Sequence, residues 1–145
     1  MKHSLTLLLL STIAYSQTPI TDTNFSAAIE DCLSTHPVTG LCVDSEYGPM
    51  PDWDVSNVTN MAEAFLFRTD FNAEIGDWDV SNVTQMGRMF DSATSFNQDI
   101  GDWDVSKVTD MYGVFGEATS FNQPIGDWDV SKVTDMYGMF FSAIS

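Results

Sequence analysis

The chain from residue 51 onward repeats one pattern of apolar and polar positions. Each unit reads I-G-D-W-D-V-S-[N/K]-V-T-x-M-x-x-x-F, and its tryptophan recurs every 25 residues, at Trp53, Trp78, Trp103 and Trp128. A fixed period of this length is typical of solenoids, in which each unit buries its apolar face against its neighbours. We therefore predict a repeat array over residues 51–145, divided into 51–75, 76–100, 101–125 and an incomplete 126–145.

The pattern within one unit predicts two short elements. In D-W-D-V-S, polar and apolar residues alternate, as in a half-buried strand with Trp and Val on the inner face. The V-T-x-M-x-x-[M/V]-F stretch that follows has apolar residues at helical spacing, for example Met86, Met89, Phe90 and Ala93. Each repeat thus predicts one short parallel strand and one short α- or 3-10 helix. The fold class expected is an α/β solenoid with the four tryptophans as structural core.

Residues 17–50 do not fit the repeat and predict an N-terminal cap. Thr21 and Asp22 are expected to cap a helix. Its apolar positions fall at i, i+4, i+7 and i+8, on Phe25, Ile29, Cys32 and Leu33. Placed before the first strand, this helix would cover the open end of the core, as solenoids require for solubility.

Residues 1–16 predict a secretory signal peptide. Lys2 gives the positive start, Leu5–Leu10 the apolar run, and a small-x-small pattern follows. The run is too short to span a bilayer, and no later segment is apolar enough to do so. We therefore expect a secreted or cell-surface protein with no transmembrane segment. In an oxidising compartment, Cys32 and Cys42 are expected to form a disulfide.

The composition is strongly acidic, with 21 Asp and Glu against 5 Lys and Arg and a formal net charge of −16. Such a field repels nucleic acid and anionic membranes, and it favours a basic protein or surface ligand. Solubility in a salty medium is an alternative reason for the same charge. The chain is not expected to be an enzyme: His36 is the only histidine after the signal peptide, and no catalytic triad, phosphate loop or metal-ligand cluster is apparent.

The strand alternation predicts an acidic face. If Trp and Val point inward, the flanking carboxylates point outward and form the candidate binding surface: Asp52, Asp54, Asp77, Asp79, Asp102, Asp104, Asp127 and Asp129. Two interpretations remain open. The carboxylates are either solvated, some of them capping turns, or they recruit Ca²⁺, which accepts several oxygen ligands in flexible geometry. The calcium alternative names Asp77, Asp79, Asp102 and Asp104, and otherwise no cofactor is expected.

Two further features concern the stacking of the units. One asparagine slot does not vary, and it predicts a hydrogen-bonded ladder through Asn72, Asn97 and Asn122. At the C-terminal end, Phe140, Phe141 and Ile144 belong to a unit with no following repeat. Three interpretations of this uncapped end are open: a truncated gene product, a fragment of a longer array, or a protein that self-associates through this surface.

The repeat W-D-V-S-N-V-T-x-M…M-F…A…F-N-x-x-I, after a D-C-L…C…Y-G-x-M-x-x-W-D-V segment, resembles the BspA-like leucine-rich-repeat surface proteins. The resemblance implies a right-handed leucine-rich-repeat-type solenoid and an adhesive or interaction role at the cell surface. We therefore expect an interaction or adhesion module that presents an acidic repeat surface. A structural segment of a larger surface assembly, or a carbohydrate-binding module with exposed tryptophans, are the alternatives.

Overall fold

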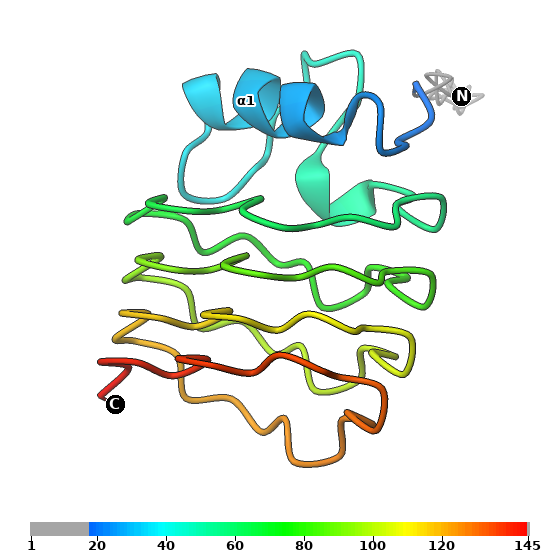
Figure 1. The fold of residues 1–145 in the computed structure, drawn as a ribbon. Coiled ribbons are helices and arrows are strands. Elements are labelled where there is room, and N and C mark those ends of the chain that lie inside the picture. Colours follow the sequence, from blue (N-terminus) through cyan, green and yellow to red (C-terminus); the bar gives the residue numbers. More distant parts are fainter. Residues whose placement is uncertain (1–17, 145) are drawn as a thin grey trace, which may run out of the picture.

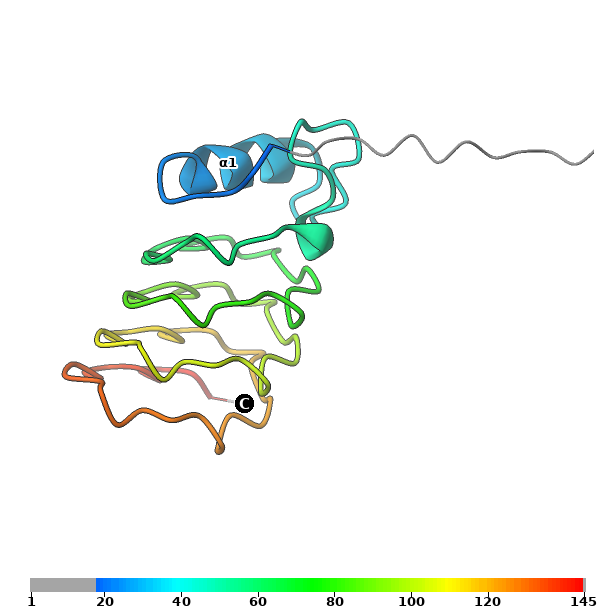
Figure 2. The same cartoon turned by 90° about the vertical axis from the view of Figure 1, so that its right-hand side faces the viewer.

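The computed structural model describes residues 18–144, and the predicted signal peptide lies outside this range. The repeats lie one below another as stacked, turn-rich layers, and a helix covers the first of them (Figures 1 and 2). That helix is α1, Phe25–Thr35. A short 3-10 helix, η1 at Met50–Asp52, leads from the cap into the first layer.

The prediction of an α/β, leucine-rich-repeat-type solenoid is wrong. Between residues 18 and 144 the chain forms α1 and η1 but no β-strand, and most of it is coil and turn. Neither the strand nor the helix predicted in each repeat is present. In the described residues, β-type pairing is limited to isolated parallel bridges: Thr21 of the cap with Asn57, and, between layers, Asn60 with Gln85, Gln85 with Asp110, and Asp110 with Asp135.

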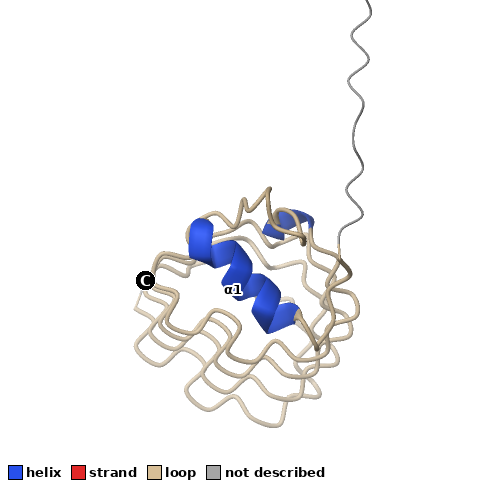
Figure 3. Cartoon of the chain, turned by 90° about the horizontal axis from the view of Figure 1, so that it is seen from above, coloured by secondary structure: helices blue, strands red, loops and turns tan. Residues whose placement is uncertain are grey.

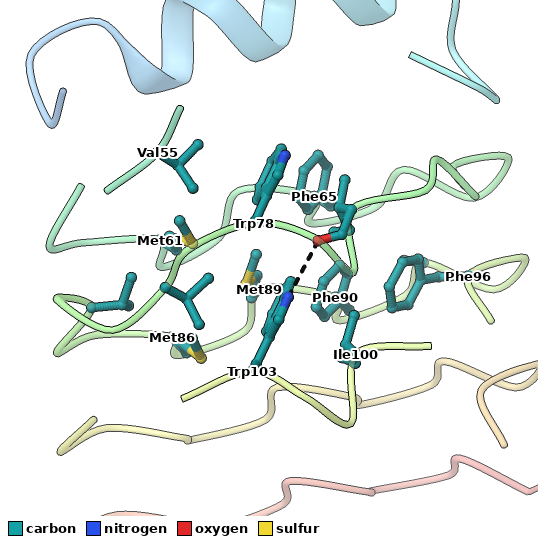
Figure 4. Packing of buried hydrophobic residues seen from close by; sticks show 14 of the residues in the cluster. Val55, Met61, Phe65, Trp78, Met86, Met89, Phe90, Phe96, Ile100 and Trp103 are labelled. Atoms are coloured by element: carbon teal, nitrogen blue, oxygen red, sulfur yellow. Dashed lines mark hydrogen bonds between the residues drawn. The ribbon is translucent and has the colours of Figure 1, made fainter. Parts of the chain in front are cut away.

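The D-W-D-V-S segments are not strands because turns close on both sides of them. In the second repeat, the Trp78 N–H donates to the Ile75 carbonyl at 3.2 Å, and the Ser81 N–H donates to the Asp79 carboxylate at 3.0 Å. In these segments, the tryptophan indole N–H forms a hydrogen bond between layers where a strand would use backbone groups. Trp103 Nε1 donates across the layers to the Ile75 carbonyl at 3.2 Å, as Figure 4 shows.

The stretch after each V-T is not a helix, because left-handed residues interrupt it. We call residues 61–68, 86–93, 111–118 and 136–143 the turn strips. Each strip has two residues with positive φ, for example Arg88 at 56° and Ser92 at 62°. An α-helix needs consecutive right-handed residues, so these strips form successive tight turns instead.

Alternate N–H groups of the first three turn strips point to the next layer. The N–H groups of residues 61, 63, 65 and 67 donate to the carbonyls of residues 85, 87, 89 and 91, each at 2.9 Å. The intervening N–H groups close turns within the strip, as when Leu66 donates to the Glu63 carbonyl at 3.1 Å. The same division recurs in the next two strips, so every layer is hydrogen-bonded to its successor in one register.

The core consists of columns of identical side chains, one from each layer. The tryptophans are 3–8% exposed. Phenylalanine rings stack between layers, with centroids 5.5 Å apart for Phe65 and Phe90 and 5.7 Å for Phe90 and Phe115. Figure 4 shows Phe65 beside Trp78 and Phe90 beside Trp103. Burying such aromatic surface is the main stabilising contribution available to this chain.

Helix α1 lies across the first layer when the stack is seen end-on (Figure 3). Its buried residues are Phe25, Ala28, Ile29, Cys32 and Leu33. The Cys32–Cys42 disulfide, with Cα atoms 5.1 Å apart, ties the helix to the segment that returns to the repeats. The predicted capping by Thr21 and Asp22 is wrong: the N-cap is Asn24, and no side chain bonds to the first turn.

Candidate functional site

All eight aspartates of the predicted acidic surface are exposed, each beside a buried tryptophan. We call them together the D-W-D face. Each repeat supplies a leading aspartate before the tryptophan and a following aspartate after it. The pKa of Asp79 is lowered by the hydrogen bonds from Ser81, while burial and the charges of Asp54 and Asp104 in the adjacent layers act in the opposite direction.

The following aspartates stabilise the turns of the repeats through hydrogen bonds. Asp54 accepts hydrogen bonds from the Ser56 hydroxyl at 2.6 Å and the Ser56 N–H at 3.1 Å. Equivalent N–H bonds of 3.0 Å fix the turns of the later repeats at Ser81, Ser106 and Ser131. The serine hydroxyl, followed by the serine N–H, lowers the pKa of each of these carboxyls: Asp54, Asp79, Asp104 and Asp129. They remain charged and fixed in direction.

The leading aspartates do not stabilise turns in this way. Within residues 18–144, Asp52, Asp77, Asp102 and Asp127 accept no hydrogen bond and form no ion pair. They are the carboxylates of this face that are free to meet a ligand. The same part of the chain holds no cluster of three or more side chains suited to a metal ion. Calcium binding at Asp77, Asp79, Asp102 and Asp104 therefore stays a prediction.

The asparagine slot links the layers beside the core. The Asn97 N–H donates to the Asn72 side-chain oxygen at 2.9 Å, and the Asn122 N–H donates to that of Asn97 at 2.8 Å. Glutamines join the same ladder, since Gln98 donates to the Asn72 carbonyl at 2.9 Å. The asparagine side chains accept from the next layer and the glutamine side chain donates to the previous one, which gives the slot a role in stacking.

A second surface feature lies on the last turn strips, and we call it the tyrosine groove. It is an open depression of about 520 Å³. Its lining consists of three glycines, three aromatic side chains and two carboxylates: Gly113, Gly116, Gly138, Tyr112, Tyr137, Phe141, Asp91 and Glu117. The two tyrosine rings stack with their centroids 5.9 Å apart, and Tyr137 is 78% exposed.

A third feature is the open groove of about 830 Å³ between α1 and the first turn strip. Asp22 lines it and joins the cap to the first repeat: its carboxylate accepts the Thr59 hydroxyl and N–H, both at 2.7 Å, and the Asn60 N–H at 3.1 Å. Arg68 pairs with Glu30 of α1 across the same junction. Most polar groups here hold the cap in place.

Residues 41–145 match the family described as "Mycoplasma protein of unknown function, DUF285". The chain belongs to this family. No curated protein and no solved structure matches the chain. The DUF285 region contains all four tryptophan repeats and Cys42, and it begins after α1. The cap helix and Cys32 therefore lie N-terminal to the part of the chain that defines the family.

The described part of this DUF285 chain includes no helix with the length and apolar character needed to cross a membrane. Its disulfide is of the kind that persists in oxidising compartments. The tryptophans, which the carbohydrate-binding alternative required at the surface, are buried. The exposed aromatic rings are instead on the turn strips, at Phe67, Tyr112, Tyr137, Phe140 and Phe141.

Sequence reasoning missed the tyrosine groove and the role of Asp22. A signal for the groove was present, because the slot of Tyr112 and Tyr137 holds Ala62 and Gly87 in the earlier repeats, and a slot that varies in this way lies at the surface. Asp22 carried no such signal. It lies outside the repeat, and its partner Thr59 is 37 residues away.

Replacing Asp22 by alanine is expected to destabilise the protein by about 1–2 kcal/mol at neutral pH, because three charge-assisted hydrogen bonds are lost at a solvent-screened site. Burial acts to raise the pKa of Asp22, but the bonds from Thr59 and Asn60 outweigh it and lower the pKa below 3.8. A lowered pKa stabilises the folded state above the unfolded pKa, and the effect disappears as the pH falls through the folded value.

The difference in the free energy of unfolding between the wild type and Asp22→Ala should therefore be largest at pH 7 and decrease below about pH 3.8. Urea unfolding followed by tryptophan fluorescence at neutral pH and at about pH 2.5 measures it. Asp44→Ala is the control, since this exposed carboxylate makes no bond within residues 18–144. Equal effects of the two substitutions at pH 7 would contradict the assignment.

Proposed function

We propose that this protein is a secreted or cell-surface interaction module that binds a basic protein partner through its D-W-D face. The observation that carries the proposal is the set of free, exposed carboxylates that recurs once per layer: Asp52, Asp77, Asp102 and Asp127. Family membership and the disulfide support a surface location, as does the resemblance to BspA-like surface proteins.

The charge balance of the described chain supports a cationic partner. Arg68 and Arg88 pair with acidic side chains of the protein itself, and Lys107 donates to the Asn82 side chain at 2.7 Å. The following aspartates are fixed by their serines, so each layer holds one carboxylate at a set direction beside a free one. A partner with lysine or arginine at a matching spacing would meet a preorganised acidic surface.

To test binding by the D-W-D face, three leading aspartates are neutralised in one variant, Asp77→Asn with Asp102→Asn and Asp127→Asn. Binding of a decalysine peptide at physiological salt is expected to weaken about ten-fold, since each exposed ion pair contributes about 0.5 kcal/mol. The control makes the same change in net charge elsewhere: Asp44→Asn, Asp70→Asn and Glu74→Gln. Calorimetric titration should show about two-fold weakening or less for this control.

An equal loss in both triple variants would mean that the peptide responds only to net charge, and it would refute the D-W-D face as a binding surface. Melting curves of both variants show whether the fold is retained. Because the substituted side chains make no bond within residues 18–144, we expect melting temperatures close to that of the wild type.

A further inference from the structure

Arg88 shows how a guanidinium is held against a turn strip. Its Nε donates to Asp91 at 2.8 Å and its Nη1 lies 3.4 Å from Glu63. The guanidinium carbon lies 5.9 Å from the centroid of the Phe67 ring. This arginine is therefore bound by carboxylates together with the face of an aromatic ring, a combination that suits a planar cation.

In the next two layers, the slot of Arg88 is occupied by Gly113 and Gly138. The backbone does not require glycine in this slot. Gly113 and Gly138 have φ values of 59° and 64°, and Glu63 and Arg88 adopt 60° and 56° with full side chains. Glycine instead leaves room beside the strip: both glycines line the tyrosine groove, and a Cβ at Gly113 would lie 3.4 Å from Arg88 Cγ.

The groove provides the same kinds of group that surround Arg88. Glu117 is exposed and accepts no hydrogen bond through its side chain within residues 18–144. Phe141 is 67% exposed, and Tyr137 offers the free face of a stacked pair of rings. Asp91 reaches the groove from the layer above while it also holds Arg88.

We propose that the tyrosine groove is a receptor for an arginine side chain of a basic partner, with the guanidinium stacked on Tyr137 and Phe141 and accepted by Glu117. The charge of the groove and of the whole chain excludes an anionic occupant. This site goes beyond the proposed function, because the D-W-D face responds to positive charge of any kind and the groove selects arginine over lysine. A lysine ammonium has no planar face to stack on the rings.

The test compares hexa-arginine with hexalysine, both titrated into the mature chain by calorimetry at physiological salt. We expect the arginine peptide to bind about five-fold more tightly than the lysine peptide. In the double variant Tyr137→Ala with Glu117→Gln, the ratio of the two peptide affinities should fall to about one. Gly138→Arg, which fills the slot with an arginine of the chain itself, should do the same.

Phe67→Ala is the matched control, since it removes a 65% exposed ring of a turn strip outside the groove, and the arginine preference should persist. The triple asparagine variant of the D-W-D face should weaken both peptides and leave their ratio unchanged, which separates the two proposals. A wild-type ratio near one would overturn the arginine receptor. So would a ratio that survives both groove variants while melting curves show them folded.

Discussion

Replacing Trp103 by alanine is expected to lower the free energy of unfolding by about 4 kcal/mol, the range of large-to-small aromatic substitutions in a core. Trp103 is 4% exposed in an interior layer, and its ring lies 6.4 Å from that of Phe90. Alanine would leave a cavity between two layers that the hydrogen bonds of the turn strips hold in register. It would also leave the Ile75 carbonyl without its indole donor.

Urea unfolding monitored by circular dichroism measures this loss. Trp103→Phe, which keeps a ring but not the indole N–H, should cost less, about 1–3 kcal/mol. Trp128→Ala is the positional control, because Trp128 is 8% exposed and belongs to the last layer. A loss at Trp103 no larger than at Trp128 would show that the interior layers are not packed through this column.

Removing the disulfide by Cys32→Ala with Cys42→Ala is expected to cost about 2–3 kcal/mol, chiefly because the unfolded chain regains the freedom of a short loop. Both cysteines are buried, with exposures of 0% and 2%. The bond connects α1 to the segment that leads into the first repeat. Without it, the cap should separate from the stack more easily and expose the apolar surface of the first layer.

Thermal melting with and without a reducing agent is the measurement for this prediction. The wild type under reducing conditions should melt close to the alanine variant, and the reductant should have no effect on the variant itself. A reduced wild type with an unchanged melting temperature would show that the disulfide is not needed to hold the cap.

The spacing of the tryptophans predicted the stacked core, and the reason is simple. A side chain repeated every 25 residues is placed above its own copy when the layers stack. Trp78 therefore stacks on Trp53, and Phe90 stacks on Phe65. The same regularity placed Asn97 beside Asn72. Patterns of this kind depend only on period, and period is visible in one sequence.

The secondary structure of the repeats was predicted wrongly, because the periodicity of apolar residues does not show which groups the backbone N–H groups bond to. The alternation in D-W-D-V-S suits a strand, yet Asp79 captures the Ser81 N–H and turns the chain after a few residues. The apolar spacing around Met89 suits a helix, yet Arg88 and Ser92 are left-handed. The first outcome is decided by a local side-chain hydrogen bond, and the second accompanies hydrogen bonds to the next layer, such as that from the Arg88 N–H to the Tyr112 carbonyl.

The free aspartates were predicted as exposed, and this part of the candidate site followed from alternation alone. The division between leading and following aspartates was not foreseen, because it depends on which carboxylate reaches the serine two residues on. The tyrosine groove depends on a difference between repeats: Gly113 and Gly138 replace Arg88. Consensus reasoning emphasises what repeats share and so overlooks such a site.

The division of N–H groups in the turn strips constrains how arrays of this kind can change in length. Gaining or losing one whole unit of 25 residues keeps the backbone hydrogen-bond register between layers unchanged, so this register allows the array to lengthen or shorten by whole units. A single inserted residue in a strip would exchange the N–H groups that bond to the next layer with those that close turns, and it would move Phe90 from the core toward solvent. Variation in repeat number is therefore tolerated, and variation in repeat length within a strip is not.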